Sequence, residues 1–170
     1  VVISESCSEK LSCPEPLEPG DKVSNRHGIK AVVSRVLPDN EMPHLADGTP
    51  VELIFSLSGV PTRWAMGQIR EAALGRVAMA KGQKAVVPPF GAPSDDELRQ
   101  SLKDAGLPEN GTEVLTDGGK PLRRPSTVGR VYWGCTIHLA RKKIQASVTP
   151  EGSTQRMGKM EVEALLEAGA

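Results

Sequence analysis

A glycine-bounded stretch, GDKVSNRHGIK, gathers charged residues between Gly20 and Lys30. It holds the cations Lys22, Arg26 and Lys30, together with His27 and a single acid. Lysine offers a compact point charge, arginine offers a planar fork of donors, and glycine lets a ligand approach the backbone. The stretch therefore fits one of two descriptions. It contacts phosphate groups, or it is a solvated turn whose glycines supply unusual backbone angles.

Motifs for other kinds of chemistry are missing from the sequence. The cationic stretch is not a P-loop, because the pattern G-x4-G-K-[ST] does not occur. No D-x-D cluster is present, and the adjacent Asp95 and Asp96 fit better as charges at the positive end of a helix. An unrelated small-molecule enzyme is the weakest hypothesis, since no acid–base pair or nucleophile–histidine arrangement supports it.

The bulk composition is that of an ordinary globular protein, with 170 residues, 38% hydrophobic and 25% charged. Lys plus Arg and Asp plus Glu both number 21, so any nucleic-acid contact must come from a local patch. Two Trp, two Phe and one Tyr are too few for a base-stacking platform.

The cysteines and the hydropathy pattern favour a cytoplasmic location. Cys7, Cys13 and Cys135 are odd in number and lack C-x2-C spacing, which argues against a zinc site or a disulfide framework and fits a reducing compartment. We find no apolar run of membrane-spanning length and no signal-peptide pattern. We therefore expect no membrane partner.

Short strands and helices alternate along the chain. β-branched and apolar runs predict strands over residues 1–4, 29–37, 51–57, 126–140 and 142–148. The segment 82–93 is expected to begin with another strand and to continue as a turn-rich link. Apolar spacing predicts helices over residues 65–80, 94–105 and 158–170. The sequence Asp117-Gly118-Gly119 predicts a hairpin turn. Many short strands with three helices between them are typical of a small closed barrel carrying helical insertions.

Two of the helices carry more specific signals. Ser94 followed by Glu97 is a capping box, and Gly106 marks the end of the same helix. Gly67 and Gly75 lie inside the helix over 65–80, where each costs about 1 kcal/mol relative to alanine. We expect close packing to offset that cost.

Several ordered motifs strongly resemble the β subunit of bacterial multi-subunit RNA polymerase. GDKVSNRHGIKAVVSRVLPDNEMPHLADGTPVELI follows the family pattern G-D-K-x-x-x-R-H-G-x-K-G and its D-M-P and D-G-T-P-V-D block. GVPTRWAMGQIREAALG, AGLPENGTEVLTDGGKPLRRPSTVG, IHLARKKIQAS and QRMGKMEVEALLEAGA resemble later family segments. The likeness runs from about Gly20 to the last residue.

The resemblance implies a fold and a domain organisation. It implies an α+β, β-rich chain, built as a closed six-stranded double-psi β-barrel with helical insertions and a C-terminal helix. We expect a single domain over residues 1–170, with residues 82–125 as an insertion that contains the capped helix.

The resemblance also implies nucleotidyl transfer by an assembled DNA-directed RNA polymerase, the isolated chain being inactive. A β′-type partner would bring aspartates that bind Mg²⁺, and this chain would bind no metal itself. RNA, the DNA template and an NTP would be the other partners. Two metals clamp the attacking and leaving oxygens in such a reaction, so this chain would supply positioning and charge neutralisation.

By the same resemblance, the basic residues take particular roles. Lys22 and Lys30 would reach RNA phosphates near the growing 3′ end, and Arg63 would meet the phosphates of the incoming nucleotide. His138 and Lys143, in IHLARKK, would contact RNA. A lone histidine in a strand is more often structural, so both roles stay open for His138. We expect Arg26 and His27 to brace the turn.

The chain also departs from the family pattern. Ala31 replaces a glycine, Trp64 replaces a methionine, Arg141 and Lys142 replace two acids, and a long glycine-rich loop is reduced to VTPEGST. We expect Trp64 and Trp133 to fill a core or an interface. The shortened loop and the neutral net charge support an alternative function, a non-catalytic β-like paralogue that binds nucleic acid or polymerase as a regulatory module.

Overall fold

The computed structural model describes residues 16–144 and 155–170, and its contacts divide the chain into two compact units. One unit comprises Pro38–Tyr132. The other combines residues 16–37 with 133–144 and 155–170, so it joins the first and last parts of the described chain. None of the described helices has the length and apolar character needed to cross a membrane.

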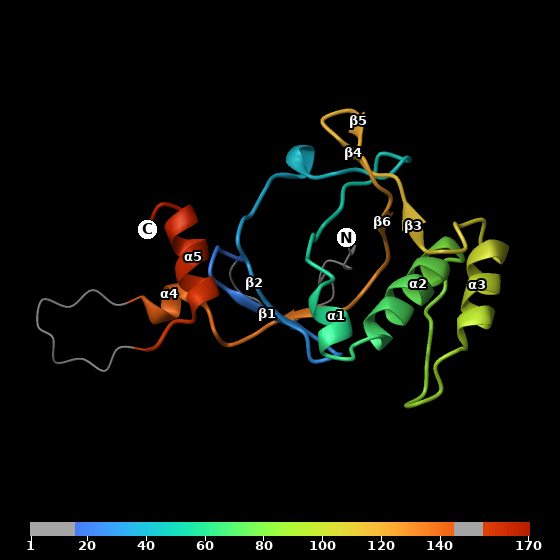
Figure 1. Ribbon diagram of the computed structural model, residues 1–170, viewed down its shortest axis with the longest axis horizontal. Helices are drawn as coiled ribbons and strands as arrows, with labels where there is room; N and C mark the ends of the chain where they lie inside the picture. The colour runs from blue at the N-terminus through green and yellow to red at the C-terminus, as the bar shows by residue number, and fades with distance from the viewer. Residues whose placement is uncertain (1–15, 145–154) are drawn as a thin grey trace, which may run out of the picture. The chain divides into compact units, whose positions relative to one another are not determined.

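A small antiparallel sheet and two helices form the unit built from the two ends (Figure 1). Its elements are β1 (Lys22–Asn25), β2 (Lys30–Val32), β7 (Trp133–Cys135), α4 (Ala140–Lys143) and α5 (Lys159–Glu167). The strand order is β2-β1-β7, and Val23 of β1 pairs with Ala31 on one side and Cys135 on the other. Side chains alternate along β1, so Val23 and Asn25 are buried while Lys22 and Ser24 are half-buried.

The turn between β1 and β2 is closed by an asparagine side chain. Asn25 Oδ1 accepts hydrogen bonds from the backbone N–H groups of His27 (2.9 Å) and Ile29 (3.0 Å), and Gly28 adopts a φ of +78°. Short polar side chains commonly stabilise turns in this way. That Arg26 and His27 also brace the turn stays a prediction, while the role of Asn25 was not expected from the sequence.

The central unit contains the other helices and two strand pairs. Its elements are the 3-10 turn η1 (Asp39–Glu41), α1 (Gly59–Thr62), α2 (Gly67–Ala80), α3 (Asp95–Asp104), β3 (Thr112–Glu113), β4 (Thr116–Asp117), β5 (Lys120–Pro121) and β6 (Ser126–Thr127). β3 pairs with β6, and β4 pairs with β5 through the predicted hairpin turn. A buried cluster of Leu45, Val51, Leu115 and Val128 forms its core.

The predicted helices are confirmed. Ser94 Oγ accepts from the Glu97 N–H (3.3 Å), while Glu97 Oε2 accepts from the Ser94 N–H (2.8 Å), which is the expected capping box of α3. α2 occupies most of the range 65–80, and α5 supplies the expected C-terminal helix.

The prediction of a closed six-stranded double-psi β-barrel is wrong. The described residues form sheets of three, two and two strands, and none of these sheets closes on itself. A barrel requires each strand to pair on both sides with a regular stagger, whereas among the described strands only β1 has two neighbouring strands. Apolar, β-branched composition favours a pleated surface but does not supply the partner strand that a ladder requires.

The strand predictions fail at particular segments for that reason. Of residues 29–37 only Lys30–Val32 pair as a strand, and residues 51–57 and 82–93 form none. Lys142 and Lys143 lie in α4 rather than in a strand. The strand predicted over 1–4, and residues 145–148 of the strand predicted over 142–148, lie outside the described residues.

Gly75 brings α2 against the segment that follows β6. A Cβ built on Gly75 would lie 2.6 Å from the carbonyl oxygen of Arg130, well inside van der Waals contact. From the other side, a Cβ built on Gly129 would lie 2.4 Å from the carbonyl oxygen of Ala72. The expected close packing is therefore present at Gly75, where it offsets the poor helix propensity of glycine.

We predict that Gly75→Ala destabilises the chain although alanine is the better helix former. Steric overlap with backbone should outweigh the propensity gain and lower the free energy of unfolding by about 1–3 kcal/mol. Urea denaturation measures the change. Gly59→Ala is the matched control, because nothing lies within 4 Å of a Cβ built there. Equal effects of the two substitutions would contradict the packing argument.

Candidate functional site

Three of the predicted basic residues lie on one small sheet. The backbone N–H of Lys22 donates to the carbonyl of His138 (3.1 Å), and the Thr136 N–H donates to the carbonyl of Lys22 (2.9 Å). These bonds continue the β1–β7 pairing beyond β7. On the other side of β1, Lys30 of β2 is paired with Ser24. The structure thus brings the backbones of Lys22, Lys30 and His138 onto adjacent segments.

Asp21 and Gly20 fix the segment that carries His138. Asp21 is 4% exposed, and its carboxylate accepts from the backbone N–H groups of Ala140 (2.7 Å) and Glu18 (2.9 Å). A carboxylate at the first N–H groups of a helix is well placed electrostatically. Gly20 has a φ of +91°, and a Cβ there would lie 2.9 Å from the Ala140 Cβ. Both residues therefore support the docking of α4 against β1.

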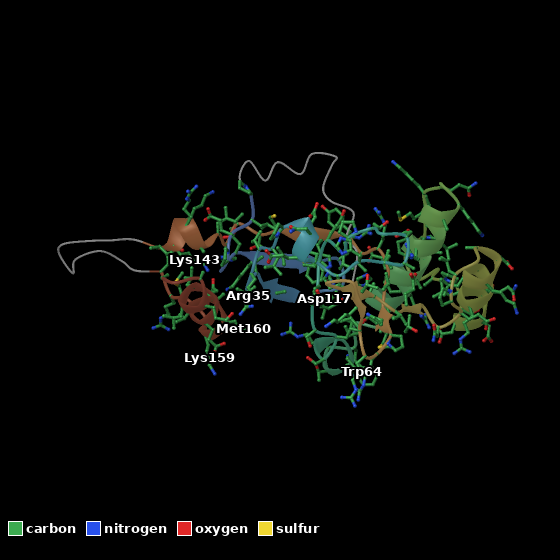
Figure 2. The ribbon with its side chains drawn as sticks, turned by 90° about the horizontal axis from the view of Figure 1, so that it is seen from above. Arg35, Trp64, Asp117, Lys143, Lys159 and Met160 are labelled. Atoms are coloured by element: carbon green, nitrogen blue, oxygen red, sulfur yellow. The ribbon has the colours of Figure 1, made fainter. Side chains whose placement is uncertain are left out.

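A buried glutamate on α5 binds two of the candidate lysines. Glu161 Oε1 lies 2.6 Å from Lys143 Nζ, and Glu161 Oε2 lies 3.1 Å from Lys22 Nζ. Oε2 also accepts from the Gly158 N–H at 2.6 Å, at the start of α5. Figure 2 places Lys143 on α4, next to the helix that carries Lys159 and Met160. One carboxylate therefore links β1, α4 and α5.

The pKa of Glu161 reflects these contacts. Burial by itself raises the pKa, because it disfavours the charged form. Hydrogen bonds from Lys143, the Gly158 N–H and Lys22 outweigh burial and lower the pKa to about 2. Glu161 is therefore ionised at neutral pH, and together with its two lysines it carries a single net positive charge.

The predicted site residues fall into two groups by their contacts. Lys143 is 6% exposed and Lys22 is 31% exposed, and both are held by Glu161. Lys30, Arg63 and His138 are exposed, and their side chains make no ion pair with any residue in the described part of the chain. Arg63 belongs to the central unit, where it follows α1. The functional roles of all five stay predictions, although Lys143 now has a structural partner.

The described residues offer no donor set for a metal ion. Among residues 16–144 and 155–170, no group of three or more His, Cys, Asp or Glu side chains lies close enough to hold one. No chemical step is therefore assigned to a metal held by this part of the chain.

Glu161, Asp21 and Asn25 were not among the residues expected from the sequence to shape the site. A usable signal existed for Glu161, which stands three residues after the helix-capping Gly158 in the family-like segment QRMGKMEVEALL. An acid at that position often caps its own helix. Nothing in the local pattern indicated that the same carboxylate would also meet Lys22 and Lys143.

Comparison with known proteins identifies related sequences. The family model described as RNA polymerase Rpb2, domain 6, matches residues 10–157. A relative from Acetivibrio thermocellus is 41% identical over 167 residues, covering 89% of this chain and 13% of the relative. Relatives from Solibacter usitatus (41% identical, 94% and 12% covered) and Mycoplasma mycoides (39%, 91% and 13%) are similar. All three are named DNA-directed RNA polymerase subunit beta, and the chain spans about one eighth of their length.

We predict that Glu161→Gln destabilises the chain in a pH-dependent way. The pKa of Glu161 is lowered from 4.5 to about 2 on folding, so its carboxylate stabilises the fold above about pH 4.5. That contribution, about 3 kcal/mol, is lost as the pH falls toward 2. Urea denaturation from pH 7 to pH 2 should therefore show a gap between wild type and variant that closes in acid.

The control for this prediction is Glu163→Gln on the same helix. Glu163 is 55% exposed and pairs with Lys159 at 3.4 Å, so its loss should change the free energy of unfolding by less than about 0.5 kcal/mol. A Glu161→Gln gap of the same size at every pH would contradict the assigned pKa.

Proposed function

Because the chain belongs to the RNA polymerase Rpb2 domain 6 family, we propose that it works as part of the β-type subunit of a DNA-directed RNA polymerase. The family match over residues 10–157 carries the proposal. That range includes the strands and the turn around Lys22, Lys30 and His138, together with Arg63. In the assembled enzyme these residues act beside RNA, the DNA template and the incoming NTP.

Exposed basic side chains are suited to this role. Lys30 and His138 flank β1 on the same small sheet and have no ion pair among the described residues, so their donors are available to an anion. Charge-assisted hydrogen bonds to phosphate are stronger than neutral ones and fix the position of the ligand. We assign Lys22, Lys30 and His138 to RNA phosphates near the 3′ end, and Arg63 to the phosphates of the NTP.

The metal chemistry belongs, in this proposal, to a β′-type partner whose aspartates hold Mg²⁺. When bound there, the metal would stabilise the attacking and leaving oxygens of nucleotidyl transfer. The contribution of this chain is to hold the RNA end and to offset its negative charge, which is a positioning and electrostatic role.

One observation favours the alternative of a non-catalytic β-like module that binds nucleic acid or polymerase. Lys22 and Lys143 both have an internal anionic partner in Glu161, as they would if they served only to hold the fold together. The two functions differ in whether loss of the exposed cations slows nucleotide addition or only weakens association.

We predict that Lys30→Ala slows nucleotide addition in an assembled polymerase that contains this chain. Loss of a charge-assisted contact costs about 1.5–3 kcal/mol, which corresponds to a roughly tenfold to hundredfold lower rate. Single-nucleotide extension of a stalled RNA measures it. Lys159→Ala, at an 87% exposed site on α5, is the matched control and should leave the rate unchanged. An unchanged rate for Lys30→Ala with normal assembly would favour the non-catalytic module.

We predict that Arg63→Ala acts on the nucleotide rather than on the RNA. Removal of a contact to the NTP phosphates should raise the KM for NTP by about tenfold or more, since each 1.4 kcal/mol of lost binding is a factor of ten. Extension rates over a range of NTP concentrations separate KM from kcat. Arg99→Ala, on the exposed side of α3, is the control. A lower kcat with an unchanged KM for NTP, which is the kind of change expected for Lys30→Ala, would contradict this assignment.

A further inference from the structure

The two lysines that contact Glu161 differ in their access to solvent. The side chain of Lys143 is 6% exposed and that of Glu161 is 1% exposed, whereas the side chain of Lys22 is 31% exposed. Of the three side chains, Lys22 is therefore the one that a ligand can reach. The net positive charge of the cluster formed by Lys22, Lys143 and Glu161 is therefore accessible to solvent at Lys22.

The carboxylate oxygens are not shared equally between the lysines. Oε1 accepts from Lys143 at 2.6 Å, the shorter of the two lysine contacts. Oε2 lies 3.1 Å from Lys22 and also accepts from the Gly158 N–H at 2.6 Å. An ammonium group has three N–H donors, so contact with one carboxylate oxygen leaves Lys22 with donors for a second anion. The geometry orients Lys22 without using up its capacity to bind.

We propose that Glu161 is a positioning residue that holds the ammonium of Lys22 for an RNA phosphate, with Lys143 as its buried counter-ion. This inference rests on the proposed function, in which Lys22 contacts RNA near the 3′ end. Lys143 is essential to it, because a lone Glu161 would cancel the charge of Lys22. With Lys143 present, the group keeps one net positive charge to attract the phosphate.

This arrangement orients the ammonium group of Lys22 before RNA binds. A free lysine side chain has many rotamers, and ordering them on binding weakens the contact. Here β1 fixes the backbone of Lys22 and Glu161 fixes its ammonium. The side-chain entropy of Lys22 is therefore lost on folding rather than on RNA binding. The first shell of a functional site commonly needs such a supporting partner.

A competing view treats Glu161 as an internal lock. In that view the carboxylate occupies the place of the RNA phosphate and must be displaced before RNA binds. The two views predict opposite effects of removing the charge, because a positioning residue helps the contact whereas a lock opposes it.

The test is a double-mutant cycle in an assembled polymerase that contains this chain, with Lys22→Ala, Glu161→Gln and the double variant. The readout is the rate of single-nucleotide extension. Glu161→Gln should slow extension by about tenfold in the presence of Lys22 and by less than about twofold when Lys22 is already alanine. A structural role alone would slow both backgrounds by the same factor, and that result would overturn the proposal. Faster extension by Glu161→Gln would overturn it in favour of the lock.

The cycle separates failure of this inference from failure of the proposed function. If Lys22→Ala leaves extension unchanged, the RNA contact of Lys22 is refuted, and the positioning role is refuted with it. If Lys22→Ala slows extension but Glu161→Gln acts independently, only the positioning role is refuted.

Lys143 provides the second variant for the case in which Glu161→Gln does not assemble. Lys143→Met leaves Lys22 and Glu161 in place and removes only the buried counter-charge. We expect it to slow extension by about three- to tenfold in the presence of Lys22, and Lys143→Arg to restore most of the rate because it keeps the charge. Unchanged extension by Lys143→Met, or an equal loss in Lys143→Arg, would overturn the role of the counter-ion.

Discussion

The buried carboxylate of Glu161 is the interaction on which the unit around β1 depends. A charge that is 1% exposed is tolerated only when partners replace its lost hydration. Glu161 finds those partners in Lys22 of β1, Lys143 of α4 and its own helix N-terminus. Three elements far apart in the chain must therefore dock together for the charge to be satisfied. In the described residues this sheet has three short strands, and the ion pairs of Glu161 add a link between β1, α4 and α5 beyond the strand pairing.

A carboxylate and an amide side chain also organise the rest of the cationic stretch. Asp21 fixes the start of α4, and Asn25 closes the turn that leads to Lys30. Some basic side chains therefore make internal ion pairs that stabilise the fold, whereas others are exposed to solvent. Lys22 lies between the two groups, since it is ion-paired and yet partly exposed. A chain with no net charge can in this way expose basic side chains on one small sheet.

Sequence reasoning succeeded where the determining interactions are local. The capping box of α3 and the turn between β4 and β5 depend on residues within a few positions of one another, and both are confirmed. The barrel failed because a ladder depends on partner strands that composition does not reveal. The Glu161 cluster was missed because its members lie on three separate elements. Trp133 is buried as expected, but Trp64 is 89% exposed with a φ of +53°, so it lies outside any core of the described residues (Figure 2).

The central claim is that the surface around β1 meets the growing end of an RNA chain. Photo-crosslinking tests it most directly, with a reactive nucleotide placed at the RNA 3′ end of a stalled complex that contains this chain. The account predicts that the crosslinked peptides come from residues 20–30 and from the segment around His138. Efficient crosslinking that falls entirely on other parts of the complex would contradict it.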